Sequence, residues 1–298
     1  MKILALDIGG TAVKSGLFCD GQLTSFEEFP TQAHLGAAVM MKNILDYILD
    51  QAPDAVGIST SGQVDPTDGS IAFATDAMPG YTGFPVKQYI HEQTGLPVSV
   101  ENDVNSAALG EAHFGAAKGI HHFLCLTIGT GIGGAIFING KLYLGANGIA
   151  GEVGHMTTHL DGVPCNCGNR GCYEAYASTS ALVRRAEQEL GKKVTGRDLF
   201  AARAEANISK LFDRWADEIV AGLTSLTYSF NPQAIVLGGG MMSQPEIISL
   251  IREKYAQRVI PSFSRTELLS AALGNQAGIY GAYYSALELT GSPTDQTQ

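Results

Sequence analysis

The spacing of hydrophobic and polar positions predicts a chain of alternating strands and helices. Residues 3–19 form two apolar runs joined by a Gly-Gly-Thr turn, which predicts a β-hairpin that a third short run extends. Apolar residues at helical spacing predict helices over 35–51 and 86–94, and short apolar runs predict buried strands over 54–59 and 96–100. The remaining predicted elements are helices over 105–114, 180–190, 208–230 and 278–289, and strands over 234–237 and 267–273.

A second copy of the opening motif follows in the middle of the chain. Residues 124–142 repeat the order of strand, Gly/Thr turn, strand and Asn-Gly turn, with Asp7 opposite Thr127 and Gly9 opposite Gly129. This duplication predicts an α/β protein of two domains whose Gly-rich turns face a shared cleft. The expected domains are residues 1–117 plus about 278–298, and residues 118–277 with a cysteine-rich segment over 151–174.

Composition and charge narrow the classes of protein to which the chain can belong. Its 298 residues are 45% hydrophobic, which is enough for two ordinary cores. The formal net charge of -10 argues against binding to nucleic acid or to an anionic membrane, because both need clustered Lys and Arg. The sequence has no apolar run of about 18 residues and no signal-peptide pattern, so we expect a cytoplasmic protein.

The glycine-rich turns are candidate phosphate-binding sites. Gly129, Gly131 and Gly134 match the G-x-G-x-x-G pattern of dinucleotide-binding proteins, but a predicted strand follows them where that site needs a helix. The turns over 7–11 and 127–134 either bring backbone N–H groups and Thr hydroxyls to phosphate oxygens or are only tight hairpin turns. A third glycine run, between a strand and a helix, suits a nucleotide's sugar and base. The candidate nucleotide-binding residues are Gly9, Gly10, Thr11, Thr130, Gly131, Gly133, Gly239 and Gly240.

The segment over 151–174 predicts a zinc site, because it holds three of the chain's five cysteines. One imidazole and three thiols are the ligand set of a closed tetrahedral zinc site. By spacing alone His159 could replace His155 as a ligand, and the cysteines could instead be buried thiols. Glu152 and Glu174 flank the cluster, where we expect a metal-pinned loop to hold both carboxylates ready to bind hydroxyl groups. The predicted ligands are His155, Cys165, Cys167 and Cys172.

Six motifs are spread over essentially the whole chain. They are Asp7-Ile-Gly-Gly-Thr, Glu101-Asn-Asp, Thr127-Ile-Gly-Thr-Gly-Ile-Gly-Gly, Glu152-Val-Gly-His155, Cys165-Asn-Cys-Gly-Asn-Arg-Gly-Cys172-Tyr-Glu174 and Leu237-Gly-Gly-Gly. Together they resemble the ROK family of bacterial sugar kinases, which belongs to the actin-like ATPase superfamily. The resemblance implies two ribonuclease-H-like domains that hinge around ATP. It also implies transfer of the γ-phosphate of ATP to the 6-hydroxyl of a hexose, with glucose or an N-acetylhexosamine such as N-acetylmannosamine as leading acceptors.

The same resemblance implies cofactors, an assembly and two competing functions. We expect ATP, Mg²⁺ and a structural Zn²⁺ as cofactors, and a homodimer. The ROK family also includes sugar-responsive transcriptional regulators, which carry an extra N-terminal helix-turn-helix segment, whereas here the first strand starts at Ile3. A non-enzymatic actin-like ATP-binding module is the second alternative, but it does not explain the pairs Asn102-Asp103 and Glu152-His155. We therefore favour the kinase.

Residue roles follow from the motifs that match. Asp103 is the candidate general base, although its place between a strand and a helix equally suits a helix N-cap, and Asn102 is expected to bind the same sugar. Glu152, His155 and Glu174 resemble sugar ligands of the family, so His155 would use one ring nitrogen for zinc and the other for a hydroxyl. Four protein ligands enclose the zinc too fully for it to activate water.

Two residues of the first hairpin are expected near the phosphates. The resemblance implies that Asp7 orients Mg²⁺ through water, and Lys14 either lies near the phosphates or is an exposed strand lysine. One departure concerns Ser61-Gly62, where family members commonly carry Pro-Gly, and the loop over 76–84 has no clear match. The identity of the sugar therefore stays open.

Overall fold

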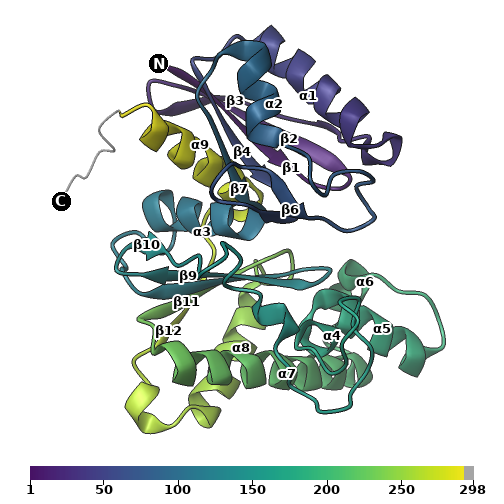
Figure 1. Cartoon of the computed structure of the whole chain (residues 1–298). Helices are drawn as coiled ribbons and strands as arrows, with labels where there is room; N and C mark the ends of the chain where they lie inside the picture. The colour runs from purple at the N-terminus through teal and green to yellow at the C-terminus, as the bar shows by residue number, and fades with distance from the viewer. Residues whose placement is uncertain (292–298) are drawn as a thin grey trace. The chain divides into compact units, whose positions relative to one another are not determined.

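The computed structural model describes residues 1–291, which divide into two compact units (Figure 1). Compared with the expected boundaries, unit 1 extends to Gly119 and also takes in the segment Leu142–Ala150. The expected C-terminal stretch 292–298 lies outside the described residues. Of the described residues, unit 1 contains Met1–Gly119, Leu142–Ala150 and 275–291, and unit 2 contains Ile120–Lys141 and Gly151–Gly274.

Unit 1 is built on a five-stranded sheet in the order β3-β2-β1-β4-β7. β2 is antiparallel to both β1 and β3, because two tight turns join these three strands. β4 runs parallel to β1, and β7 runs parallel to β4. The carboxyl ends of β1, β4 and β7 therefore meet at one edge of the sheet. The bounds are β1 (Lys2–Ile8), β2 (Ala12–Cys19), β3 (Gln22–Pro30), β4 (Ala55–Thr60) and β7 (Val98–Asn102).

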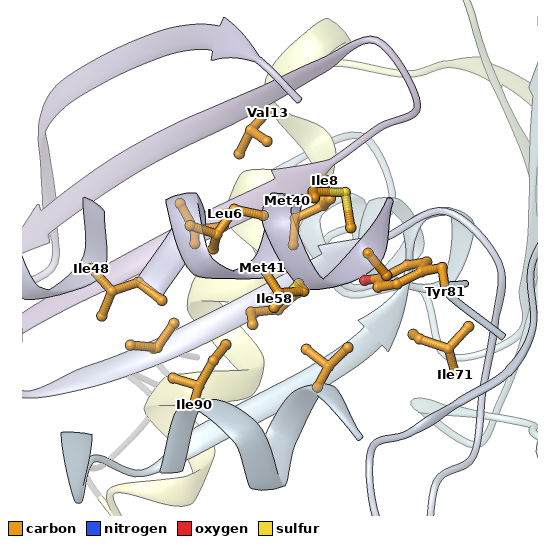
Figure 2. Packing of buried hydrophobic residues seen from close by; sticks show 14 of the residues in the cluster. Leu6, Ile8, Val13, Met40, Met41, Ile48, Ile58, Ile71, Tyr81 and Ile90 are labelled. Carbon is orange, nitrogen blue, oxygen red and sulfur yellow. The ribbon is translucent and has the colours of Figure 1, made fainter. Parts of the chain in front are cut away.

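Helices cover both faces of this sheet, and alternate residues of β1 point into two separate cores. Leu4 and Leu6 belong to a core that also contains Met40 of α1 and Ile90 of α2. Figure 2 shows Leu6, Met40 and Ile90 of this core. Ile3 and Ala5 point to the other face, where they pack against α9. By the same alternation Asp7 lies on the α9 face. The helices of unit 1 are α1 (Ala37–Gln51), α2 (Val86–Thr94), α3 (Asp103–Phe114) and α9 (Ala277–Leu289).

Helices α3 and α9 pack on each other through glycines. A Cβ atom at Gly281 would collide with the backbone of Ser106, and one at Gly110 would collide with the backbone of Ala277. The sheet approaches equally closely, since a Cβ at Gly57 of β4 would collide with the carbonyl of α9. These contacts bring the first turn of α9 to the carboxyl ends of β1 and β4, where the yellow helix lies beside the purple strands in Figure 1.

Unit 2 repeats the strand order of unit 1, which confirms the duplication predicted from the sequence. Its five-stranded sheet runs β10-β9-β8-β11-β12, with β9 antiparallel to β8, and β11 and β12 parallel. The strands are β8 (Phe123–Ile128), β9 (Ile132–Ile138), β10 (Lys141–Leu142), β11 (Ala234–Gly238) and β12 (Glu267–Ser270). The helices are α4 (Glu174–Ala177), α5 (Thr179–Leu190), α6 (Gly196–Ala201), α7 (Ala206–Phe230) and α8 (Pro245–Arg258).

The predicted elements are present, with shifted ends that have local causes. The strand expected over 96–100 begins after Pro97, which has no N–H to donate, and continues to Asn102. The strand expected over 267–273 ends at Ser270, because the partner strand β11 ends beside it. Within residues 1–291 no helix is long and apolar enough to cross a membrane. Shorter elements are β5 (Gln63–Val64), β6 (Ile71–Phe73), and 3-10 turns η1 (Ala33–Leu35), η2 (Val153–His155), η3 (Pro261–Phe263) and η4 (Gly274–Gln276).

Candidate functional site

A row of polar side chains crosses the sheet of unit 1 near the carboxyl ends of its parallel strands. The strand register pairs Lys14 of β2 with Asp7 of β1, Asp7 with Ser59 of β4, and Ser59 with Glu101 of β7. Paired residues point to the same face of a sheet, so all four side chains lie on the α9 face. Four neighbouring polar side chains on one face, near the carboxyl ends of the parallel strands, make this edge a candidate site.

Asp7 is the centre of this row. Its Oδ1 accepts a hydrogen bond of 2.8 Å from the Ser59 hydroxyl, and its Oδ2 lies 3.3 Å from the Lys14 ammonium. The Lys14 side chain is 27% exposed and that of Asp7 is 18% exposed. Lys14 is therefore partly buried, and the alternative that it is an exposed strand lysine is wrong. Ser59 was not predicted as a site residue. The sequence alone does not distinguish it from the adjacent Thr60, because only the strand register places it beside Asp7.

The residue pair at the end of β7 resolves the question of which side chain caps α3. Asn102 is the N-cap, because its side-chain oxygen accepts hydrogen bonds from the N–H groups of Val104 at 2.9 Å and Asn105 at 3.2 Å. Asp103 is the first residue of the helix itself. The alternative that Asp103 is the cap is therefore wrong, and its Oδ1 accepts the Val104 N–H at 2.9 Å from within the first turn of the helix.

The Asn102 amide also holds Asp103 in place. Its Nδ2 donates to Oδ1 of Asp103 at 2.9 Å and to the carbonyl oxygen of Gly62 at 2.9 Å. Gly62 has φ +104°, and a Cβ there would lie 2.7 Å from the Phe73 carbonyl oxygen, so only glycine fits at this position. Both hydrogens of the amide and both lone pairs of its oxygen are thus used within the protein. A sugar hydroxyl would have to replace one of these bonds to bind Asn102.

The surroundings of Asp103 suit a proton acceptor. Burial is the largest influence and, together with the negative charge of Asp7, it raises the pKa of Asp103 to about 6. Hydrogen bonds from the Val104 N–H and the Asn102 amide oppose this shift. A carboxyl group with a pKa near the working pH is both ionised and basic enough to remove a proton from an alcohol. Burial also raises the pKa of Glu101, which accepts hydrogen bonds from Asn102 N and Asn105 Nδ2.

The first glycine turn lies beside this row. Gly9 N–H donates to the Ala12 carbonyl at 3.0 Å, and the Thr11 carbonyl accepts from Thr31 N–H at 3.0 Å, so the backbone of the turn is fixed at two points. A Cβ at Gly10 would meet no described atom within 4 Å, which leaves that side of the turn open. The predicted phosphate-binding turn and Asp7 are therefore brought together in unit 1.

In unit 2, four predicted metal ligands converge. The ligand atoms of His155, Cys165, Cys167 and Cys172 all lie within 4.8 Å of one another. The Cys167 and Cys172 sulfurs are 3.6 Å apart, and the Cys165 sulfur is 3.8 Å from Nδ1 of His155. Zinc–sulfur bonds of about 2.3 Å in a tetrahedron separate two sulfurs by about 3.8 Å. The residues present therefore fit a tetrahedral zinc ion.

Backbone geometry lets the cysteines converge. Gly168 has φ +89° and Gly171 has φ +74°, which favour glycine, and a Cβ at Gly171 would collide with the backbone of His159. His159 itself is not part of the cluster. Its Nε2 lies 3.5 Å from Glu218, and its ring stacks on Tyr176 with centroids 3.8 Å apart. The alternative of His159 as the zinc ligand is therefore wrong.

The two predicted carboxylates flank the His155 ring on its opposite nitrogens. Glu174 Oε1 lies 3.8 Å from Nδ1 and Glu152 Oε2 lies 4.0 Å from Nε2. The other oxygen of Glu174 accepts the Ile132 N–H at 3.3 Å, and a Cβ at Gly131 would lie 2.5 Å from it. Gly131, which was predicted to face a nucleotide, thus makes room for Glu174. With Nδ1 directed to the sulfurs, Nε2 and Glu152 form the outer edge of the cluster.

A cavity of about 970 Å³ lies in unit 2 beside the second glycine turn. The turn and the first residue of α5 are joined by a 2.9 Å hydrogen bond from Thr179 N–H to the Gly129 carbonyl. Of the predicted nucleotide-binding residues in unit 2, Thr130 and Gly240 line the cavity, whereas Gly131, Gly133 and Gly239 do not. The lining residues are Gly129, Thr130, Thr179, Ser180, Val183, Arg184, Glu187, Thr195, Gly196, Arg197, Phe200, Ala201, Gly240, Met241 and Gln244.

Most of this lining was missed from the sequence, because it comes from four segments that only the fold brings together. Arg184 and Glu187 lie on α5, Arg197 and Phe200 on α6, and Met241 follows β11. Polar residues on amphipathic helices give no signal that separates a cavity wall from a solvated face. A pocket of this size, with glycine backbone at one end and a Phe ring in its wall, is large enough for a nucleotide.

Comparisons with known proteins agree with these observations. The sequence model described as the ROK family matches residues 3–288. A β-glucoside kinase from Listeria innocua is 36% identical, covering 97% of this chain and 98% of that protein. Among solved structures, a ROK hexokinase from Thermus thermophilus aligns with a TM-score of 0.86 and 35% identity over 98% of this chain and 100% of that one. A ROK family glucokinase from Streptomyces griseus, solved with glucose and AMPPNP, has a TM-score of 0.84 and 32% identity over 97% of this chain and 100% of that one.

Proposed function

The chain belongs to the ROK family, and from this we propose that it is an ATP-dependent sugar kinase that phosphorylates the 6-hydroxyl of a hexose. The observation that carries the proposal is the Asp103 carboxylate, which Asn102 and Val104 hold by one oxygen and whose pKa is raised to about 6. The likeness to hexose kinases over almost the whole length of each protein supports the same activity. Glucose and N-acetylhexosamines are the leading acceptors, and β-glucosides join them through the Listeria relative.

Asp103 is the proposed general base. The two hydrogen bonds to its Oδ1 fix the carboxylate, so Oδ2 is the oxygen we assign to take the proton of the attacking hydroxyl. The oxygen of the sugar then bonds to the γ-phosphorus of ATP while the bond from that phosphorus to the bridging oxygen breaks, and ADP leaves. A positioned base of this kind contributes about 10²–10⁴ in rate.

Glu152, His155 and Glu174 are the proposed ligands of the sugar hydroxyls. The grounds are the 4.0 Å approach of Glu152 to Nε2 of His155 and the fixed position of Glu174 against the Ile132 N–H. Carboxylates and an imidazole offer acceptors and a donor in fixed directions, which suits a polyhydroxyl ligand. A structural zinc ion, when bound by His155 and the cysteines, would supply rigidity to this loop.

The cavity beside Thr130 is the proposed nucleotide site, and the turn at Gly9 to Thr11 the proposed contact to the transferred phosphate. The cavity volume, the glycine backbone at Gly129 and Gly240, and the Arg184 and Arg197 guanidinium groups support this assignment. Mg²⁺, when bound with ATP, would neutralise phosphate charge. Asp7 offers the hard carboxylate oxygens that this ion prefers.

Sugar-panel kinetics test the proposal. ADP release is followed with glucose, N-acetylmannosamine, N-acetylglucosamine and a β-glucoside as acceptors, and the product of the best acceptor is examined by ³¹P NMR. We expect sugar-stimulated ADP release, a 6-phosphate product, and no reaction with the 6-deoxy form of the best sugar. ATP turnover that no sugar in the panel stimulates would refute the kinase, and phosphorylation of the 6-deoxy sugar would refute only the 6-hydroxyl assignment. The homodimer stays a prediction, which light scattering tests.

A further inference from the structure

The carboxylate of Asp7 has three neighbouring groups in unit 1: Ser59, Lys14 and the first turn of α9. Ser59, which is fully buried, donates its hydroxyl to Oδ1 at 2.8 Å. Lys14 approaches Oδ2 from the neighbouring strand at 3.3 Å. The third neighbour is the first turn of α9, where a Cβ at Gly278 would lie 3.1 Å from both Asp7 Cγ and Ser59 Oγ. The positive end of a helix thus faces the carboxylate as well.

These three contacts differ in stiffness. Ser59 lies near the end of β4, where strands on both sides pair with it, and its side chain is short, so its hydroxyl fixes the plane of the carboxylate. Lys14 reaches Oδ2 through a flexible four-carbon stem and its side chain is 27% exposed. If the Ser59 bond were absent, the carboxylate would be free to rotate toward the Lys14 ammonium. The lone pairs of its two oxygens would then point in another direction than they do with the Ser59 hydrogen bond in place.

We infer that Ser59, with Gly278 behind it, is a positioning residue that orients Asp7 toward the Mg²⁺ that accompanies the nucleotide. This inference rests on the proposed kinase function, because the nucleotide and its metal come from that function. Ser59 touches neither substrate nor phosphate in this account and acts through Asp7 alone. Gly278 supplies the space that lets Asp7 and Ser59 meet at 2.8 Å.

The chain offers a matched control for Ser59. Ser99 lies on β7 and belongs to the same face of the same sheet, by its pairing with Gly57 in the register that also pairs Ser59 with Glu101. Its hydroxyl is buried and has no hydrogen-bond partner among residues 1–291. Ser59→Ala and Ser99→Ala therefore remove the same group from the same face, and only the first removes a bond to Asp7.

The test measures the affinity of ADP with and without added Mg²⁺ by isothermal titration calorimetry. We expect Mg²⁺ to strengthen ADP binding to the wild-type protein and to the Ser99→Ala control. In Ser59→Ala this gain should shrink about tenfold, since a hydrogen bond to a charged group is lost, while metal-free ADP binds as before. A wild-type protein without a Mg²⁺ gain, or a Ser59→Ala variant that keeps the full gain, would overturn the inference.

Gly278→Ala gives a second, independent variant in case Ser59→Ala does not fold. Alanine favours a helix over glycine, so this change should leave the melting temperature equal or higher. Its Cβ must nevertheless displace Asp7 or Ser59 by a few tenths of an ångström, and we expect the same tenfold loss of the Mg²⁺ gain. An intact gain in a folded Gly278→Ala protein would contradict the steric part of the inference. Failure of the kinase proposal is seen separately, as absence of sugar-stimulated ADP release by the wild-type protein.

Discussion

At the scale of single residues, Asp103 carries the chemistry of the proposed reaction. Asp103→Asn keeps the shape of the side chain and its oxygen can still accept from Asn102 and Val104. The variant cannot take a proton, so we expect kcat to fall by about 10²–10⁴. Sugar affinity, measured by calorimetry, should change little because the other sugar ligands remain. A near-normal kcat would show that Asp103 is not the base.

The pH dependence of the wild-type enzyme follows from the same residue. Burial and the charge of Asp7 raise the pKa of Asp103 to about 6, and only the ionised form accepts a proton. We therefore expect kcat/KM to rise with pH through an apparent pKa near 6 and to level off above it. An acid limb near pH 4, as for an unperturbed carboxyl, would contradict the buried environment described for Asp103.

The raised pKa also has a consequence for stability. Because the folded protein binds this proton more tightly than the unfolded chain, ionisation of Asp103 costs stability. The cost is absent below pH 3.8, the ordinary pKa of Asp in the unfolded chain, grows up to about pH 6, and is constant above that pH. Asp103→Asn should therefore be more stable than the wild type by about 1–3 kcal/mol at pH 8. Urea unfolding at pH 8 and pH 4 checks this, and an equal difference at both values would contradict it.

Asp103 is predicted from the sequence and the family resemblance as the general base, with a helix N-cap as the alternative. An acidic residue between a strand and a helix is typical of both a catalytic carboxylate and an N-cap. The structure makes Asn102 the N-cap, because its oxygen accepts the N–H groups of Val104 and Asn105, and the catalytic role of Asp103 stays a prediction. Ser59 was missed altogether, because a serine at the end of a strand has meaning only once the register sets it beside Asp7.

At the scale of elements, we expect the cysteine-rich loop over 151–174 to depend on the proposed zinc ion. Without zinc, no metal bonds join the three thiols and the imidazole, so these groups would separate or share protons. Glu152 and Glu174 would then no longer be held in fixed positions. We expect Cys167→Ser, or zinc removal by a chelator, to weaken sugar binding at least tenfold and to lower the melting temperature together. Cys19→Ser, outside the cluster, is the control. A zinc-free protein that bound sugar normally would contradict the proposed role of this loop.

The contact of α3 with α9 is a second element with a testable requirement. Gly281→Ala improves helix propensity by about 1 kcal/mol, but its Cβ would collide with the Ser106 backbone. Since that backbone belongs to a packed helix, we expect a net loss of about 1–3 kcal/mol in the free energy of unfolding. Chemical denaturation measures it. An unchanged or raised midpoint would mean that the two helices can move apart at no cost.

Most helices and strands could be predicted from the sequence, because the period of apolar residues and the glycines at turns are strong local signals. The helix over 86–94 has the predicted bounds, and the repeated strand order was visible as a repeated motif. The helix α6 (Gly196–Ala201) was not predicted, since six residues are too few for a clear period. Its capping box of Thr195 and Asp198 was the signal that could have revealed it.

At the scale of the whole molecule, the two units share a strand order but not a chemistry. At the positions that hold Asp7 and Lys14 in unit 1, the register of unit 2 has Thr127 and Gly133. Unit 1 thus has the row of Asp7, Ser59 and Lys14, while unit 2 has the His/Cys cluster and the cavity of about 970 Å³.

The measurement that tests the central claim most directly is sugar-dependent ADP release by the wild-type protein and Asp103→Asn at pH 8. Both proteins are assayed with ATP and Mg²⁺, with and without the best acceptor of the panel. We expect the sugar to stimulate ADP release by the wild type. Asp103→Asn should lose this stimulation while still binding the sugar. Release that is independent of sugar, or equal in the two proteins, would contradict it.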